Sequence, residues 1–194
     1  IIILIQMNNN LIKQFIEEHS ETVKKFDSSK IDAAVKIMID ALNNDSKIFW
    51  CGNGGSASQA NHLSAELIGG MHKNKIKPFN SICLNVDNAF LTAWSNDDSF
   101  ENIFSRQLQA IGKKGDILIG LSTSGNSINI NKAASYAKKS DIKVISLTGN
   151  DGGKLKSISD LNINVDSEST QRIQEMHILI GHIICDLIER NYIS

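Results

Sequence analysis

The chain contains little cysteine and almost no proline. Among its 194 residues there are three cysteines and one proline. Cys51, Cys83 and Cys185 form no Cys-x-x-Cys pair, and an odd number of widely spaced cysteines predicts reduced thiols instead of a disulfide framework. Cys51 adjoins a glycine-rich run, where we expect a small buried residue at a strand end and not a nucleophile. Pro78 falls between predicted elements and interrupts none of them.

The chain also has no excess of either positive or negative charge. The formal net charge is −1, with 41% hydrophobic and 21% charged residues, a composition that is ordinary for a globular protein. Because there is no global basic field, we expect no nucleic-acid partner. The basic run 72–77 lacks interleaved aromatic residues and is interpreted as a solvated loop.

The apolar start of the chain is too short to be a membrane span or the core of a signal peptide. Apolar residues occupy only positions 1–5, and Met7 looks like a natural beginning. We therefore interpret residues 1–6 as an upstream or non-native extension and residues 8–194 as one domain without repeats. Without a targeting segment, we expect a cytoplasmic location and no membrane partner.

Short apolar runs alternate with helical patterns along most of the chain. Residues 8–44 predict two helices that break near 27–29. The alternation that follows favours an α/β fold, in which helices cover both faces of a parallel sheet. The predicted strands cover 47–51, 81–85, 116–121, 143–148 and 161–165, and the later predicted helices cover 56–69, 87–94, 100–111, 127–139 and 170–190.

Two runs rich in glycine and serine each follow a predicted strand and precede a predicted helix. They are 51–58 (Cys-Gly-Asn-Gly-Gly-Ser-Ala-Ser) and 121–127 (Leu-Ser-Thr-Ser-Gly-Asn-Ser). Unpaired N–H groups and the helix dipole at such a turn favour an anion. The carboxyl ends of parallel strands are also where an open sheet binds ligands. The two runs therefore predict a pocket for a phosphorylated small molecule.

Neither run is a standard nucleotide-binding motif. The first lacks the Lys-Ser/Thr pair of a Walker A loop, and Ala57 replaces the last glycine of a Gly-x-Gly-x-x-Gly motif. The second can hold phosphate through neutral hydroxyl donors, although a helix cap in a polar loop would have the same composition. The residues that carry these hydroxyls are Ser122, Thr123, Ser124 and Ser127.

Two pairs of polar residues lie at helical spacing. His62 and Glu66 are four residues apart, and Gln174 and His182 are eight apart, so each pair shares one face of a helix. Together these residues suit zinc or another divalent ion, and Glu66 and His182 also suit proton transfer. Spacing alone does not show that the two helices meet. A histidine on an amphipathic helix is usually structural, and we interpret His177 in that way.

Further motifs complete a pattern that is similar to a known family. In combination the motifs resemble those of the phosphoheptose isomerases, also called sedoheptulose-7-phosphate isomerases, which are sugar isomerase (SIS) domain proteins. The resemblance covers nearly everything from residue 8 onward. It implies a three-layer sandwich of SIS type, with a five-stranded parallel sheet between helices and with long N-terminal and C-terminal helices. The motifs are 51–56, 122–127, His62 with Glu66, 96–97, 103–106, 147–149, 151–154, 172–175, His177 and His182.

The resemblance implies an aldose-ketose isomerase. Such an enzyme converts D-sedoheptulose 7-phosphate to D-glycero-D-manno-heptose 7-phosphate through an enediolate, the first step of bacterial nucleotide-activated heptose synthesis. It also implies a homotetramer with active sites between subunits, one zinc ion per subunit, and proton transfer by Glu66 and His182. The implied substrate contacts are Asn53, Gly54, Gly55, Ser56, Glu66, Asn96, Asp97, Ser122, Thr123, Ser124, Ser127 and Gln174, and the implied zinc ligands are His62, Glu66, Gln174 and His182.

Two positions depart from the family pattern. A Gly-Arg pair often follows the helix of Glu66, whereas this chain has Gly69 and Gly70, so a basic contact into a neighbouring site is missing. Gln171 stands where some members carry aspartate. These departures concern the choice of heptose phosphate and leave the isomerase chemistry intact.

Non-catalytic SIS-domain modules are the main alternative to an enzyme. Some relatives bind the bacterial replication initiator and have lost the catalytic pair, and others sense sugar phosphates within transcription regulators. The presence of Glu66 and His182 argues against the first kind, and the lack of a helix-turn-helix segment before residue 40 argues against the second. A domain of a glucosamine-6-phosphate synthase would need a glutaminase domain, for which we expect no room in 194 residues.

Overall fold

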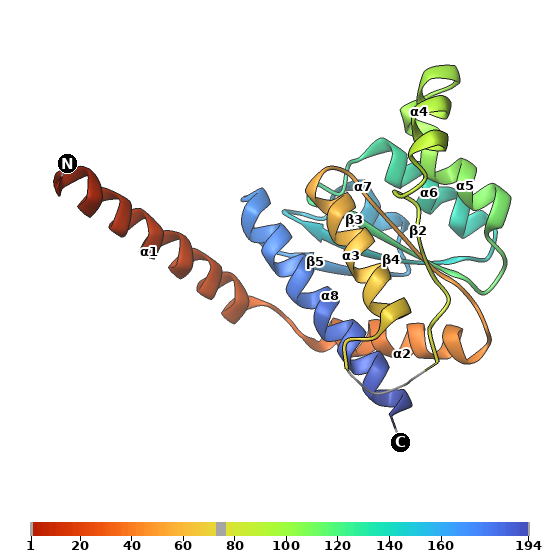
Figure 1. Cartoon of the computed structure of the whole chain (residues 1–194), viewed down its shortest axis with the longest axis horizontal. Helices are drawn as coiled ribbons and strands as arrows, with labels where there is room; N and C mark the ends of the chain where they lie inside the picture. The colour runs from red at the N-terminus through yellow and green to blue at the C-terminus, as the bar shows by residue number, and fades with distance from the viewer. Residues whose placement is uncertain (1, 73–76, 194) are drawn as a thin grey trace.

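The N-terminal helices lie at one side of the molecule. The computed structural model describes residues 2–72 and 77–193, so most of the basic run 72–77 lies outside the described residues. Helix α1 (Ile2–Lys25) extends away from the rest of the molecule, whereas α2 (Ser29–Asn43) packs against α8 and β5 (Figure 1). The predicted break between them is confirmed, and the Oδ1 atom of Asp27 accepts the N–H of Ser29 there at 3.0 Å.

Five parallel strands form one sheet in the order β2-β1-β3-β4-β5, as the alternation of elements predicted. In the register of the sheet, Trp50 lies beside Cys83 on one side and Ile119 on the other. The central strands are buried on both faces, which explains why they are almost continuously apolar in sequence. The strands are β1 (Ile48–Gly52), β2 (Ser81–Cys83), β3 (Ile117–Ser122), β4 (Lys143–Gly149) and β5 (Leu161–Val165).

Helices cover both faces of this sheet and produce the three layers expected from the sequence (Figure 1). One core contains Met38, Trp50 and Ile180, from α2, β1 and α8. The opposite core contains Phe49 and Phe104, from β1 and α5. The remaining helices are α3 (Gly55–Gly69), α4 (Asn88–Asp97), the 3₁₀ helix η1 (Phe100–Asn102), α5 (Ile103–Ile111), α6 (Ile128–Lys139), α7 (Gly153–Ile158) and α8 (Thr170–Tyr192).

A few elements differ from the sequence-based expectation. Helix α7 was not expected, because its six residues are too few to display a helical period. The helix expected over 100–111 is divided into η1 and α5. Strand β2 ends two residues before its expected end, and there the side chain of Asn85 bonds both the N–H of Gly52 (3.1 Å) and its carbonyl (2.9 Å). This amide continues the sheet contact with a side chain in place of the backbone.

The topology places the two glycine- and serine-rich runs at the same edge of the sheet. The first follows β1 and the second follows β3, and these two strands are neighbours. Both turns therefore lie at the carboxyl ends of adjacent parallel strands, where α/β folds bind ligands.

Candidate active site

The first turn leaves the start of α3 without a side-chain cap, and its residues Gly54 and Gly55 are exposed. Gly54 is the N-cap residue and has a φ of 55°, a conformation that favours glycine. Because glycine has no side chain, it cannot cap the helix itself. The amide of Gln174 lies against Gly55, since a Cβ added to Gly55 would come within 2.7 Å of Nε2. Gln174 therefore lies beside the turn that is predicted to bind substrate. Ser56, which is part of this turn, is buried.

Asn53 connects this turn to the second one. Its side chain forms a reciprocal amide pair with Asn129 of α6, with both N···O distances at 2.9 Å. Asn129 is 3% exposed and was not recognised from the sequence, because a single asparagine within a helical pattern has no distinguishing spacing. The pair holds the starts of α3 and α6 together across the edge of the sheet.

The second turn joins β3 to α6 and presents hydroxyl groups. The Oγ atoms of Ser122 and Ser127 lie 3.1 Å apart, and Ser124 is exposed. Ser127 is the N-cap residue of α6, yet its side chain makes no capping hydrogen bond. The partner of the Ser127 hydroxyl is Ser122, which is 3% exposed, so Ser124 carries the most accessible hydroxyl of the turn. Thr123 is half-buried, and its carbonyl accepts the N–H of Gly149 at 3.0 Å.

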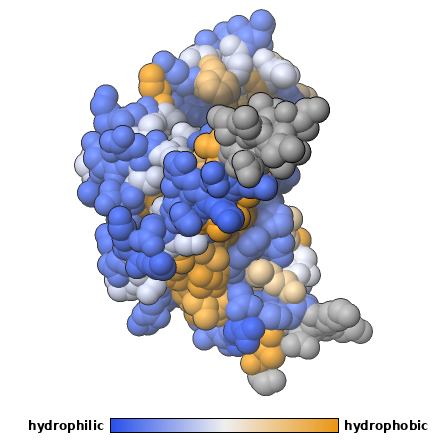
Figure 2. Space-filling model, turned by 90° about the vertical axis from the view of Figure 1, so that its left-hand side faces the viewer, coloured by the Kyte–Doolittle hydropathy of each residue, from blue (hydrophilic) through white to orange (hydrophobic). Residues whose placement is uncertain are grey.

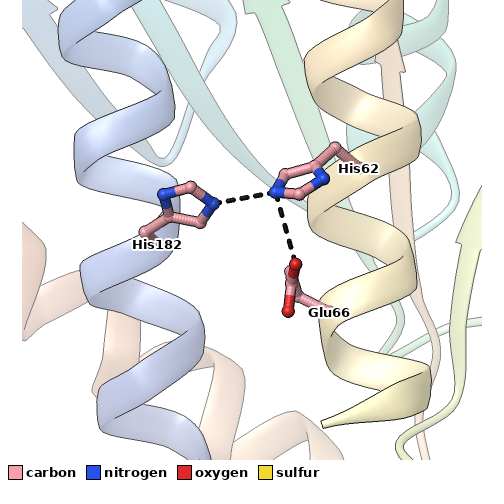
Figure 3. A group of neighbouring side chains, drawn as sticks. All are labelled: His62, Glu66 and His182. Carbon is pink, nitrogen blue, oxygen red and sulfur yellow. Dashed lines mark hydrogen bonds and ion pairs between the residues drawn. The ribbon is translucent and has the colours of Figure 1, made fainter. Parts of the chain in front are cut away.

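The structure shows that the two helices carrying the predicted metal and catalytic residues lie against each other. His62 and Glu66 project from α3 toward His182 of α8 (Figure 3). The Nε2 atoms of the two histidines are 2.8 Å apart, and Oε1 of Glu66 is 3.3 Å from Nε2 of His62. One ligand atom from each residue lies within 4.8 Å of the others. We call these three residues the His/Glu/His cluster.

A close contact beside the cluster explains how α3 and α8 come together. Gly181 faces Leu63, and a Cβ on Gly181 would lie 2.3 Å from Cδ1 of that leucine. A Cβ at this position would force the Leu63 side chain to move, and Gly181 immediately precedes His182 in the chain. The role of Gly181 was missed from the sequence, because a glycine within a helical pattern does not reveal which neighbour it faces.

The donor set of the cluster fits a zinc ion. Two imidazole nitrogens and one carboxylate oxygen converge, which matches the three protein ligands of many catalytic zinc sites. His62 is exposed and the other two residues are half-buried, so the cluster is open to a small molecule from solvent. Gln174 as a fourth ligand stays a prediction, since its amide lies against Gly55.

Asn96 and Asp97 lie apart from the cluster. They occupy the end of α4, a helix without a buried residue that stands at the margin of the molecule (Figure 1). The contact found for their side chains joins them to each other, with Nδ2 of Asn96 2.8 Å from Oδ1 of Asp97. Their expected role in substrate binding stays a prediction.

His177 is structural, as interpreted from the sequence. It is completely buried in α8, and its Nε2 donates to the carbonyl of Thr148 at 3.1 Å. Burial lowers the pKa of this imidazole to about 4, while the bond to Thr148 works in the opposite direction. His177 therefore stays neutral and packs α8 onto β4, whereas His182 on the same helix faces the cluster.

Comparison with known proteins identifies the class to which this chain belongs. The SIS domain family matches residues 13–149. The phosphoheptose isomerase of Helicobacter pylori (strain ATCC 700392 / 26695) is 48% identical over 189 residues, which cover 96% of this chain and 98% of the relative.

Two solved structures support the same assignment. A phosphoheptose isomerase from Neisseria gonorrhoeae has a TM-score of 0.87 and 39% identity, covering 95% of this chain and 99% of its own. One from Francisella tularensis has a TM-score of 0.88 and 35% identity, covering 96% of this chain and 98% of its own. The chain belongs to the phosphoheptose isomerase family of SIS-domain proteins.

Proposed function

We propose that this chain is an aldose-ketose isomerase that converts D-sedoheptulose 7-phosphate to D-glycero-D-manno-heptose 7-phosphate. The convergence of His62, Glu66 and His182 from two helices carries the proposal, because it supplies paired acid and base groups in an accessible position. The same residues separate the chain from non-catalytic SIS modules, which need a phosphate-binding turn but no proton-transfer pair. The reaction is an early step in the synthesis of activated heptoses.

The substrate phosphate binds at the hydroxyl-bearing turn after β3. The accessible hydroxyls of this turn and the N-terminus of α6 favour a dianion without a lysine. The turn after β1, from Asn53 to Ser56, contacts the sugar chain, and Gln174 reaches the same turn. Binding the phosphate at one edge of the sheet orients the carbonyl end of the sugar.

Proton transfer belongs to Glu66 and His182. Isomerisation removes a carbon-bound proton at C1 or C2 and returns it to the neighbouring carbon, while a second group moves a proton on the oxygens. A carboxylate suits the carbon-bound proton, and an imidazole suits the oxygens, because its pKa lies closer to neutrality than that of a hydroxyl group. Glu66 serves as the base and His182 as the acid, and His62 keeps both in position through its Nε2 contacts.

A zinc ion, one per subunit, is held by His62, Glu66 and His182, with Gln174 as a fourth ligand. When bound, zinc stabilises negative charge on sugar oxygens as a Lewis acid. Metal analysis after purification without chelator tests this point. A chain that neither contains zinc nor gains activity when zinc is added would use the cluster for proton transfer alone.

The chain assembles as a homotetramer with active sites between subunits. Figure 2 faces the side from which α1 extends, and hydrophobic surface gathers there between hydrophilic areas. Exposed apolar side chains of this kind mark interaction surfaces. Those of α1 and α8 are Leu11, Ile12, Phe15, Ile16, Val23, Ile183 and Leu187. Light scattering should give a mass of about four chains at micromolar concentration, whereas a mass near 21.3 kDa would contradict the assembly.

The enzyme acts in the cytoplasm, where its phosphorylated substrate would be made. None of the helices in the described part of the chain combines the length and the apolar composition needed to span a membrane. Sugar phosphates do not cross membranes unaided, so an isomerase of this kind is expected beside the reactions that supply its substrate. Fractionation of cells that express the chain would test the location.

One assay tests the proposed function directly. Purified protein is incubated with D-sedoheptulose 7-phosphate, and the aldose product is followed by NMR with and without a chelator. We expect the aldose signals to appear and to be slowed by the chelator. If wild-type protein forms no product and exchanges no carbon-bound proton with deuterated solvent, the proposal fails and a sugar-phosphate-binding module is favoured.

A further inference from the structure

Beyond the His/Glu/His cluster, α8 makes a second polar contact with the end of α3. Glu189 in the last turns of α8 is 2% exposed. Its Oε2 accepts the N–H of Met71 at 2.6 Å, and its Oε1 accepts the N–H of His72 at 3.1 Å. These residues follow Gly70, which donates its own N–H to the carbonyl of Glu66 at 2.8 Å. One buried carboxylate thus ties α8 to the turn that ends the helix of Glu66.

A second carboxylate holds the same turn. Oδ1 of Asp186 lies 2.5 Å from Nε2 of His72, and Oδ2 accepts from Nε of Arg190 at 2.6 Å. Asp186 and Glu189 follow His182 by four and seven residues, so all three lie along one face of α8. We call Asp186 and Glu189 the α8 clamp.

The position of Glu189 is unfavourable for stability alone. The carboxylate is buried near the C-terminal ends of both α3 and α8, where the helix dipoles present partial negative charge. Its hydrogen bonds come from neutral backbone N–H groups, while the adjacent Arg190 binds Asp186. A buried, hydrogen-bonded charge in such a place is better explained by the geometry that it specifies than by the stability that it adds.

Along the helix pair, the glycine contact lies level with the cluster and the clamp lies beyond it. Gly181 and Leu63 set the separation of α8 and α3 next to His182 and His62. Glu189 sets the separation about two helical turns further along α8, just beyond Glu66 on α3. Figure 3 shows the result, with Glu66 below His62 and both facing the helix of His182.

We propose that Glu189 is a positioning residue of the isomerase, which holds the end of α3 against α8 so that Glu66 keeps its place in the cluster. The inference rests on the proposed function. Residues that orient a metal ligand or a base without touching substrate typically contribute about ten- to a hundredfold. A displacement of about 1 Å at the reacting groups has an effect of the same order.

Glu189→Gln tests the proposal, because glutamine keeps the length of the side chain but turns an NH₂ group toward a backbone N–H. We expect kcat to fall about ten- to a hundredfold with KM within about twofold of wild type. Affinity for zinc should fall by a similar factor. The visible absorption spectrum of the Co²⁺-loaded protein should also change, because it reports the geometry of the ligands.

Asp116→Asn is the matched control. Asp116 is also 2% exposed and accepts two backbone N–H groups, from Lys47 and Lys113, both at 2.8 Å. It has Nζ of Lys47 at 3.4 Å as a further partner, and it lies at the opposite edge of the sheet. Both variants should lower the Tm. Only Glu189→Gln should change kcat, zinc affinity and the cobalt spectrum.

The outcomes separate a positioning role from a structural one. A Glu189→Gln protein that loses stability like the control, yet keeps the wild-type kcat and cobalt spectrum, overturns the proposal. If Glu189→Gln does not fold, Asp186→Asn replaces it, since it weakens the partly exposed contacts with His72 and Arg190, and the same pattern is expected. Failure of the proposed function would give a different result from failure of the positioning role. Wild-type protein would then not convert the heptose phosphate, while the cobalt spectrum would still report the effect of Glu189.

Discussion

The two edges of the sheet use their polar groups in different ways. At the amino ends of the strands, Asp116 accepts the N–H groups of Lys47 and Lys113, and Asp160 accepts that of Val144 at 2.8 Å. At the carboxyl ends, the turns after β1 and β3 present glycines, hydroxyls and helix N-termini. One edge satisfies its polar groups within the chain, and the other keeps groups that can bind a ligand.

The difference follows from the direction of the strands. In a parallel sheet, each strand leads at its carboxyl end into a helix N-terminus, which carries accessible N–H groups and partial positive charge. At the amino ends the chain arrives from helix C-termini, whose carbonyls carry partial negative charge and do not attract a phosphate. Substitutions at the amino edge should therefore change stability alone, and those at the carboxyl edge should change activity.

Glu66→Gln should have the largest effect. The amide keeps the size of the side chain and one oxygen but cannot accept a carbon-bound proton. Turnover should fall by at least about a hundredfold, with substrate binding largely unchanged. His182→Gln should behave similarly, with some added loss of metal. Steady-state kinetics and calorimetric titration with substrate measure the two quantities separately.

Glu21→Gln is the control for this variant, because Glu21 is exposed on α1 and pairs only with Lys24 in the contacts of the described residues. It should have wild-type turnover. A Glu66→Gln enzyme that exchanges the C1 proton with deuterated solvent at the wild-type rate would remove Glu66 from the mechanism.

Substitution of His177 tests whether a buried group near the carboxyl edge contributes to stability, as we expect of the groups at the amino edge. Burial lowers its pKa from 6.5 in the unfolded chain to about 4 in the folded protein. Between these values only the unfolded state binds the proton, so the stabilisation is complete above pH 6.5 and is lost as the pH falls toward 4. This linkage amounts to about 3 kcal/mol.

Urea unfolding at pH 7.5 and pH 4.5 measures the contribution of His177. His177→Gln retains a donor for Thr148 but carries no charge at either pH. Between the two conditions, the free energy of unfolding of the wild type should fall by about 2–3 kcal/mol more than that of the variant. Equal pH dependence in both proteins would mean that His177 titrates normally in the folded state.

Ser124→Ala should weaken substrate binding. Its hydroxyl is exposed on the turn after β3, where it also accepts the N–H of Asn126 at 3.2 Å. Loss of a hydrogen bond to a charged phosphate corresponds to about 1.5–3 kcal/mol, or about ten- to a hundredfold in affinity. Ser157→Ala, which removes an exposed hydroxyl from α7, is the control. Unchanged affinity of the Ser124 variant by calorimetry would place the phosphate elsewhere.

Asp116→Asn should have the smallest effect on function and a measurable one on stability. The asparagine NH₂ would face a backbone N–H that the carboxylate now accepts, which leaves a buried donor unsatisfied. The free energy of unfolding should fall by about 1–3 kcal/mol, with kcat and KM unchanged. A loss of activity in this variant, measured on folded protein, would contradict the separation of the two edges.

Most of the fold could be predicted from the sequence. Apolar runs of strand length, alternating with helical periods, indicated a parallel sheet between helices, and the five strands lie within two residues of their expected bounds. The short α7 could not be predicted in this way, because its sequence has too few residues to show a period. The end of β2 depended on Asn85, whose partner Gly52 lies on another strand.

The candidate site was predicted less completely. The sequence indicated the two turns and the residue types of the His/Glu/His cluster, because glycine, hydroxyl and histidine patterns are local. It did not indicate Asn129, Gly181 or Glu189, whose contacts join helices that are far apart in the chain. Each of these residues is unremarkable within its own helix.

The alternation of strands and helices, the two glycine- and serine-rich turns and the residue types suited to metal binding or proton transfer could all be recognised in the sequence alone. These properties depend on backbone conformation and side-chain chemistry within a few residues. The approach of α3 to α8, which brings the Nε2 atoms of His62 and His182 to 2.8 Å, arises from tertiary packing. That proximity depends on the absence of a Cβ at Gly181 and on the buried carboxylate of Glu189, and so on packing between segments more than a hundred residues apart.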